Sequence, residues 1–89
     1  MRIVWGRQAL ADYKAWNDDG RKRINMLVES IQSEGLLKGA GMPERLRHKW
    51  SGWCSRRIVK EHRLVYRIVG EGDKAVLEIA QCMYHYGRR

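Results

Sequence analysis

The sequence lacks the features that mark several large classes of protein. It has only two cysteines, one proline and ten acidic residues against eighteen Lys and Arg. No apolar run approaches the roughly 18 residues of a membrane-spanning helix, and Met1–Trp5 is too short for a signal peptide. We therefore expect a cytoplasmic protein that does not act at a membrane.

The cysteines are not arranged as metal ligands. Cys54 and Cys82 both lie in strand-like segments, and neither belongs to a Cys-x-x-Cys pair of the kind that a structural zinc site uses. A structural disulfide is not expected in a reducing compartment. We therefore expect both to be small core residues, and we expect no metal or other cofactor.

The shortage of acidic residues gives the chain a strong positive charge. Its formal net charge is +8 and its pI is about 10.0. A domain of this charge attracts polyanions, and nucleic acid is the usual partner. The 89 residues form one domain, 1–89, with a single modest core.

The first half of the chain has helical patterns. Alternation predicts a short strand at Arg2–Trp5, and apolar spacing predicts a helix over 7–17. A turn at Asn17–Gly20 supplies an N-cap for a second helix that ends at Gly35. The apolar stripe of the second helix consists of Ile24, Leu27, Val28 and Ile31.

The second half has strand patterns and follows a loop at 35–43. Strands are expected at 45–49, 52–60, 62–69 and 75–86, with turns at Lys60–Glu61 and Gly70–Asp73. The order β-α-α-β-β-β-β predicts an α+β fold in which both helices pack on one face of a mostly antiparallel sheet. The free face would then carry the function.

Residues 44–66 combine many cations with few acids. Only Glu44 and Glu61 are acidic in this stretch, and Trp50, Trp53 and Tyr66 lie among its Arg and Lys residues. In the strand that follows, Leu64, Tyr66 and Ile68 would share one face, and Arg63, Val65 and Arg67 the other. This pattern indicates an apolar side for the core and a guanidinium side for an anion, which we expect to be phosphate.

Several side chains in this region could cleave RNA without a metal. Cleavage needs a base for the ribose 2′-OH, cations at the phosphate and an acid for the leaving 5′-oxygen. A carboxylate, arginines and a histidine meet these needs, and the candidates are Glu44, Arg47, Arg57, Arg63, His85 and Tyr86.

Each candidate also has a purely structural interpretation. Glu44 could balance local charge, His85 could be a hydrogen-bonded sheet residue, and Arg56–Arg57 could be a solvated edge. His48 and His62 are interpreted as turn or surface residues. For Trp50 and Trp53, packing is favoured over base stacking.

Five segments in order resemble a known family. They are MPERLRH (42–48), WSGW (50–53), SRRI (55–58), EHRLVY (61–66) and the terminal YHY (84–86). Together they resemble the Txe/YoeB toxins of the RelE superfamily, which belong to bacterial toxin–antitoxin systems. The resemblance covers nearly the whole chain.

The resemblance implies a microbial-RNase-like fold and a ribosome-dependent endoribonuclease that cuts mRNA in the ribosomal A site. The mRNA and the rRNA of that site would be its partners. It places the general base on Glu44, the phosphate-stabilising arginine on Arg63 and the general acid on His85. Arg47, Arg57 and Tyr86 match substrate-binding positions. It also implies an acidic YefM/Axe-like antitoxin, and members of the family can dimerise.

The chain departs from the family pattern at a few points. Arg45 follows Glu44 where a small residue or proline is common, Arg47 replaces a frequent lysine, and Gly87–Arg89 extends the usual end. Strand alternation also leaves open whether Glu78 or His85 points to the free face, and a β-bulge near Glu78 would decide it.

Two other functions remain open from sequence. A binding poison of the same fold, like the gyrase-inhibiting ParE relatives, would not need Glu44 or His85. A basic nucleic-acid adaptor is the third interpretation. The Tyr84–Tyr86 ending favours the nuclease, because the ParE relatives lack it.

Overall fold

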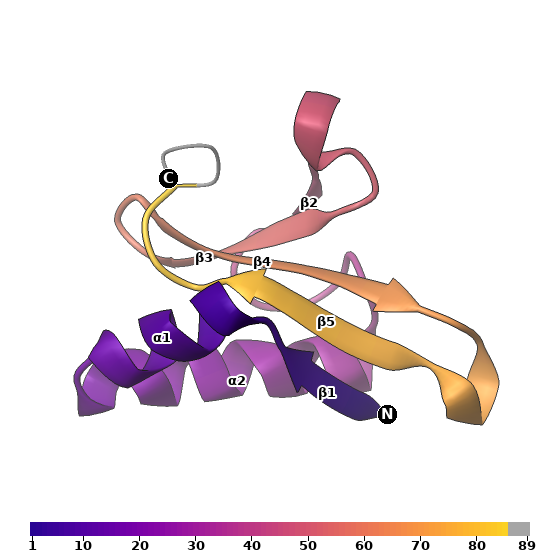
Figure 1. Ribbon diagram of the computed structural model, residues 1–89, viewed down its shortest axis with the longest axis horizontal. Helices are drawn as coiled ribbons and strands as arrows, with labels where there is room; N and C mark the ends of the chain where they lie inside the picture. The colour runs from indigo at the N-terminus through magenta and orange to yellow at the C-terminus, as the bar shows by residue number, and fades with distance from the viewer. Residues whose placement is uncertain (86–89) are drawn as a thin grey trace.

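The computed structural model describes residues 1–85 and, within them, packs two helices against one face of a five-stranded sheet (Figure 1). This is the predicted α+β fold in the predicted order. Its elements are β1 (Arg2–Trp5), α1 (Arg7–Ala15), α2 (Asp18–Glu34), β2 (Glu44–Arg45), the 3₁₀ turn η1 (His48–Trp50), β3 (Cys54–Val59), β4 (His62–Val69), the 3₁₀ turn η2 (Gly72–Lys74) and β5 (Val76–Gln81).

The sheet is mostly antiparallel, as predicted. Its strand order is β1-β5-β4-β3-β2, and β1 pairs in parallel with β5 while the other neighbours are antiparallel. The β2–η1 segment rises on the side of the sheet away from the helices, and the described chain after β5 turns toward the same side (Figure 1). This second side is called the open face below.

The core lies between the helices and the sheet. The predicted stripe of α2 is buried, and it packs against Leu64 and Tyr66 of β4 and against Leu77 and Ile79 of β5. Cys54 and Cys82 are free and buried in the same core, which confirms their packing role. Within residues 1–85, no helix is long and apolar enough to span a membrane.

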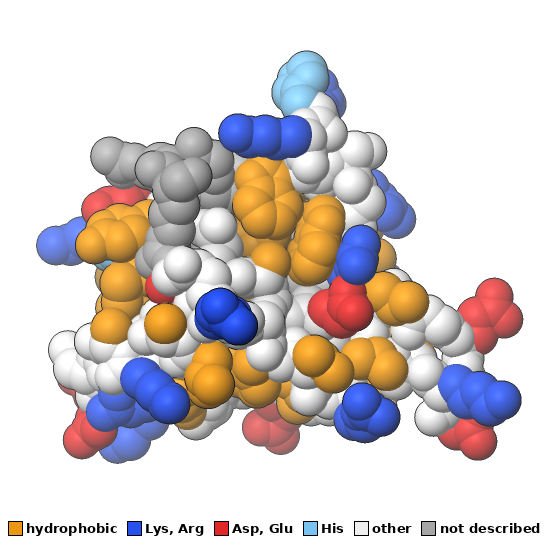
Figure 2. Space-filling model, in the orientation of Figure 1, with side chains coloured by type: hydrophobic (Ala, Val, Ile, Leu, Met, Phe, Trp, Pro, Cys, Tyr) orange, Lys and Arg blue, Asp and Glu red, His pale blue; other side chains and the backbone are white. Residues whose placement is uncertain are grey.

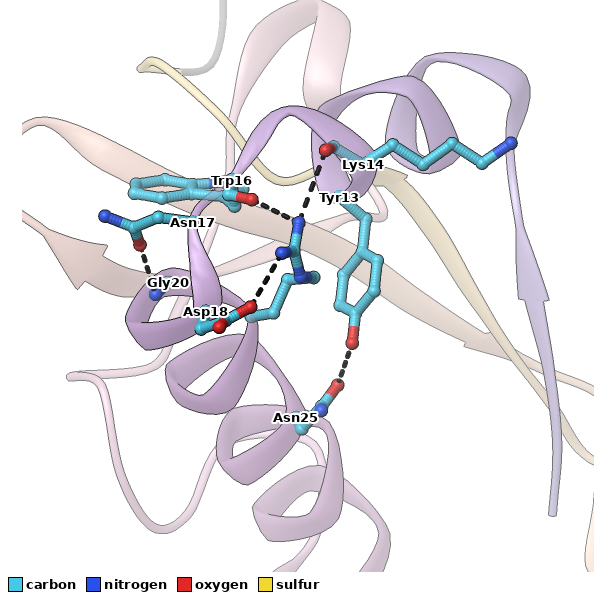
Figure 3. A network of polar contacts seen from close by, with 8 residues as sticks. Tyr13, Lys14, Trp16, Asn17, Asp18, Gly20 and Asn25 are labelled. Carbon is cyan, nitrogen blue, oxygen red and sulfur yellow. Dashed lines mark hydrogen bonds and ion pairs between the residues drawn. The ribbon is translucent and has the colours of Figure 1, made fainter.

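The junction between the helices is held by polar contacts (Figure 3). Trp16 is extended and Asn17 caps α2 by accepting a hydrogen bond from Gly20 N–H at 2.8 Å, so α1 ends earlier than the predicted 7–17. The Arg21 guanidinium donates to the carbonyls of Lys14 and Trp16. A Cβ at Gly20 would overlap the Trp16 indole, so the close packing of the junction requires a glycine there.

Arg56 is fully buried, so the interpretation of this residue as part of a solvated edge is wrong. Its guanidinium donates to Tyr66 Oη (2.9 Å), to Ser30 Oγ (3.0 Å) and to loop carbonyls that include those of Gly35, Lys38 and Ala40. The loop expected at 35–43 therefore packs around a buried cation. Arg57, the next residue, is exposed.

Two predicted strands are shorter than expected around η1. After Arg45 one further bond, from Leu46 N–H to the Trp53 carbonyl, joins β2 to β3. Pairing then ends because His48 has a left-handed backbone with φ 58° and Trp50 N–H turns back to the Arg47 carbonyl. The chain then forms η1 instead of continuing to residue 49, and β3 begins at Cys54 rather than at 52. The β4 strand has its predicted bounds.

The last strand ends at Gln81, five residues before the predicted end at 86. Its register with β4 shifts between Val65 and Tyr66, because Val65 pairs with Gln81 whereas Tyr66 pairs with Ile79. This bulge leaves Leu77 and Ile79 in the core, places Glu78 on the open face against Arg67, and returns Cys82 to the core. It resolves the ambiguity that alternation left for Glu78.

The buried guanidinium gives a first prediction, on stability. Arg56→Leu should lower the free energy of unfolding by about 3 kcal/mol or more, because several buried carbonyls lose their donor at roughly 1–3 kcal/mol each. Arg57→Leu, its exposed neighbour, should change it by less than about 0.5 kcal/mol. Urea unfolding of both variants measures the difference, and equal effects would contradict the structural role of Arg56.

A second prediction concerns alkaline pH. Burial raises the pKa of the Cys54 thiol from 9.0 and that of the Tyr66 phenol from 10.0, against the lowering influence of Arg56. As pH rises, the unfolded chain therefore loses these two protons at a lower pH than the folded chain does. The contribution of the two groups to the free energy of unfolding should be fully present below about pH 9 and should be lost as pH rises through their raised pKa values. Cys54→Ala should reduce the fall seen in urea unfolding between pH 8 and 10. An unchanged slope would rule out this contribution from Cys54.

Candidate active site

The strand register brings four chain segments together on the open face. Glu44 of β2 is opposite Ser55 of β3, Ser55 is opposite Val65 of β4, and Val65 is opposite Gln81 of β5. Directly opposed residues point to the same side of a sheet. Ser55, Val65 and Gln81 are nearly inaccessible, so these uncharged side chains form a floor with the exposed Glu44 at its edge.

Two arginines face each other in the next row. Arg57 of β3 is paired with Arg63 of β4, which puts their Cβ atoms about 5 Å apart. Like charges in directly opposed positions destabilise a strand pair. This arrangement becomes favourable when an anion lies between the two guanidinium groups, so the row has the charge pattern of a phosphate site.

Arg63 is already held at one side of this row. Its Nη1 donates to the carbonyl of Lys60 at 2.7 Å and to that of His62 at 3.2 Å. The turn after β3 therefore orients the guanidinium. Its other donors can reach an anion without breaking these contacts, because arginine carries five N–H groups.

Glu44 and Arg47 lie in the segment formed by β2 and η1 (residues 44–50), which borders the floor and is called the arm below. Together with Arg45, Leu46 and His48 they line an open hollow of about 360 Å³. In the view of Figure 2, Lys and Arg side chains are interspersed with Asp and Glu side chains, and large apolar side chains gather beneath the projecting arm. The net charge of +8 favours the approach of a polyanion to this region.

His85 reaches the same region by a different route from the one predicted. The final strand does not extend to it. Instead, the Arg63 N–H donates to the Tyr84 carbonyl at 3.0 Å, so the chain after β5 lies against the start of β4. His85 follows directly, next in sequence to a residue bonded to Arg63. Tyr86 lies outside the described residues.

The two tryptophans of the WSGW segment form a packed pair, as favoured from sequence. Their ring centroids are 5.7 Å apart with the planes perpendicular. The Arg67 guanidinium lies 4.4 Å from the centroid of the Trp53 ring and bonds to Glu78 at 2.6 Å. This cluster supports the floor one row beyond Glu44.

The sequence matches, over residues 5–86, the family described as the YoeB-like toxin of bacterial type II toxin-antitoxin systems. The chain belongs to this family. The chain is 38% identical to "Toxin YoeB" of Escherichia coli K12, with 97% of this chain and 100% of that protein aligned. The YoeB match confirms the resemblance of the five sequence segments.

Solved YoeB structures have the same fold. A YoeB/ParE toxin from Agrobacterium tumefaciens is 37% identical with a TM-score of 0.92, covering 97% of this chain and 100% of its own. The YoeB of Staphylococcus aureus is known as a dimer (44% identity, TM-score 0.83) and in complex with YefM (43%, 0.84), each covering 97% of this chain and 98% of its own. The YoeB fold thus extends over nearly the whole chain.

Sequence reasoning missed the residues that hold the end of this YoeB-family chain. His62, Asp12 and Trp16 all contact the segment after β5. One signal was available for Asp12, since its spacing from Ala9 and Trp16 puts it on the inward side of α1. Nothing in the pattern distinguished His62 from an ordinary turn histidine.

Proposed function

We propose that this YoeB-family toxin is an endoribonuclease that cleaves mRNA in the ribosomal A site by metal-free acid–base chemistry. The observation that carries the proposal is the opposed pair Arg57 and Arg63, which lies one row of the sheet from Glu44. The backbone of Arg63 also bonds to Tyr84, the residue before His85. Base, phosphate site and acid then lie around one uncharged floor.

The proposed reaction is a transesterification within the RNA. Glu44 takes the proton of the ribose 2′-OH, and the 2′-oxygen attacks the adjacent phosphorus. Arg63 and Arg57 stabilise the charge that grows on the phosphoryl oxygens. His85 gives a proton to the leaving 5′-oxygen as the P–O5′ bond breaks. The products are a 2′,3′-cyclic phosphate and a free 5′-hydroxyl.

The remaining candidates would bind the substrate. Arg47 lies three residues after Glu44 along the same hollow, where its charge can hold a neighbouring phosphate. Tyr86, next to His85 in sequence, would orient the nucleotide. Among residues 1–85, no three His, Cys, Asp or Glu side chains are grouped so that they could hold a metal ion.

The ribosome would supply the placement of the RNA. The chain combines a net charge of +8 with a floor of uncharged side chains at the site. Charge gives affinity for any RNA backbone but no register on it. To fix one particular phosphate between Arg57 and Arg63, the RNA must therefore already be held in position by the ribosome.

An acidic antitoxin of the YefM type would neutralise this toxin. The basic open face offers electrostatic complementarity to an acidic segment, and the Staphylococcus aureus relative forms a complex with YefM. The same bound segment would keep phosphate from the two arginines. A second copy of the chain is a further expected partner.

The requirement for placement gives the third prediction. Cleavage of ribosome-bound mRNA should be at least about 10²-fold faster than cleavage of the same free RNA, since positioning alone can contribute a factor of this size. The new 3′ ends should carry a cyclic or ordinary phosphate. Primer extension gives the rates and enzymatic end analysis gives the end groups; equal rates or 3′-hydroxyl ends would contradict the proposal.

The fourth prediction separates a nuclease from a ParE-like binding poison. His85→Ala and Arg63→Ala should each lower the single-turnover cleavage rate about 10²–10⁴-fold with little change in ribosome affinity. Glu44→Gln should act similarly. The controls Lys22→Ala and Glu29→Gln change exposed charges on α2, across the sheet from the site, and should cleave normally. Growth inhibition that survives Glu44→Gln and His85→Ala would favour the binding poison.

A further inference from the structure

We infer that His62 is a positioning residue, which fixes the segment 82–85 against the site so that His85 is presented beside Arg63. The inference rests on the proposed function, in which His85 is the acid. In this inference His62 does not contact the RNA, and its role is to position His85, which does. Three sets of contacts carry it.

The first set binds both backbone groups of Tyr84. Its N–H donates to Nδ1 of His62 at 2.7 Å, and its carbonyl accepts from the N–H of Arg63 at 3.0 Å. Tyr84 has a left-handed backbone with φ 61°, which a residue with a side chain adopts only when its surroundings impose it. The His62 and Arg63 contacts therefore determine the direction in which the chain leaves for His85.

The second set holds Cys82, two residues earlier. Its N–H donates to Oδ2 of the buried Asp12 at 3.0 Å, and its carbonyl accepts from Nε1 of Trp16 at 2.6 Å. Asp12 is itself held by Gln8 at 2.9 Å. The segment is thus bound to α1 at Cys82 and to β4 at Tyr84, without belonging to either element.

The third set orients the imidazole of His62. Its ring meets the Trp16 ring edge-on with centroids 4.9 Å apart, and it contacts the Tyr84 ring at 5.4 Å. Because Nδ1 accepts, the ring proton is on Nε2, which lies 3.8 Å from the Glu61 carboxylate. Trp16 is fixed in turn by the helix junction of Figure 3, so the acceptor has a defined position.

This anchor solves a geometric problem of the site. A segment outside a strand is mobile unless other contacts hold it, and β5 ends at Gln81. An acid must stay within about 3 Å of its leaving group, and a misplacement of about 1 Å can cost 10²-fold in rate. The side chains of Asp12, Trp16 and His62, with one backbone bond from Arg63, replace the missing strand pairing.

The fifth prediction tests this role with two substitutions of nearly equal shape. His62→Asn places an amide oxygen where Nδ1 stands and keeps an acceptor for Tyr84 N–H, whereas His62→Leu removes it. Both lose the ring contacts with Trp16 and Tyr84, so a purely structural role would affect them alike. The Leu variant should cleave ribosome-bound mRNA at least about 10-fold more slowly in single turnover, and the Asn variant within about threefold of the parent. Ribosome affinity should be unchanged in both.

Hydrogen exchange of the Tyr84 amide, followed by NMR, reports the anchor without any activity. Protection should persist in His62→Asn and be lost in His62→Leu. Trp16→Phe, which removes the donor to the Cys82 carbonyl and reduces the ring that packs on His62, should also slow cleavage if His62→Leu does not fold. Equal cleavage by the Asn and Leu variants, or unchanged Tyr84 protection in the Leu variant, would overturn the inference. A parent protein that does not cleave ribosome-bound RNA would instead refute the proposed nuclease, and the exchange experiment would still decide the anchor.

Discussion

The structure depends above all on one buried cation, Arg56. A guanidinium removed from water is costly unless nearly all of its donors are bonded. Here the partners are the Tyr66 and Ser30 hydroxyls and the carbonyls of the loop after α2, including those of Gly35, Lys38 and Ala40. The path of the loop that supplies these carbonyls also delivers the chain to β2. The position of Glu44 at the edge of the open face therefore follows from a contact on the opposite side of the sheet.

The segment 82–85 is placed by a different constraint, the bulge in β5. Without it, regular alternation would put Cys82 on the open face, where it could not enter the core beside Ala9. The bulge also lets Cys82 N–H turn away from the ladder to Asp12. Both borders of the candidate site, the arm with Glu44 and the segment with His85, are thus fixed by contacts made to the helix side.

Much of this could be predicted from local pattern, and the rest could not be. Apolar periodicity located α2, β1 and β4, because each has one buried face and caps or turns at its ends. The predicted strands around η1 and after Gln81 were too long for two reasons. The backbone of η1 bonds to the nearby carbonyls of Arg47 and His48, and the backbone after Gln81 bonds to the side chains of Asp12 and His62. The candidate residues Glu44, Arg57 and Arg63 do come together through the strand register. The anchor of His85 could not be foreseen, because it depends on α1 and β4 meeting at one point.

Arg56 and Arg57 show why stability and the proposed chemistry are tied to one register. They are adjacent in a strand, so one side chain points into the core and the other to the open face. Arg56 bonds only to neutral oxygens, all from protein groups, whereas Arg57 faces a second guanidinium-bearing residue across the strand pair. A shift of β3 by one residue would expose Arg56 and would bury Arg57 among groups that do not match its hydrogen-bond donors. The core cation therefore selects the register that opposes Arg57 to Arg63, so the two arginines of the proposed phosphate site are brought together by the fold itself.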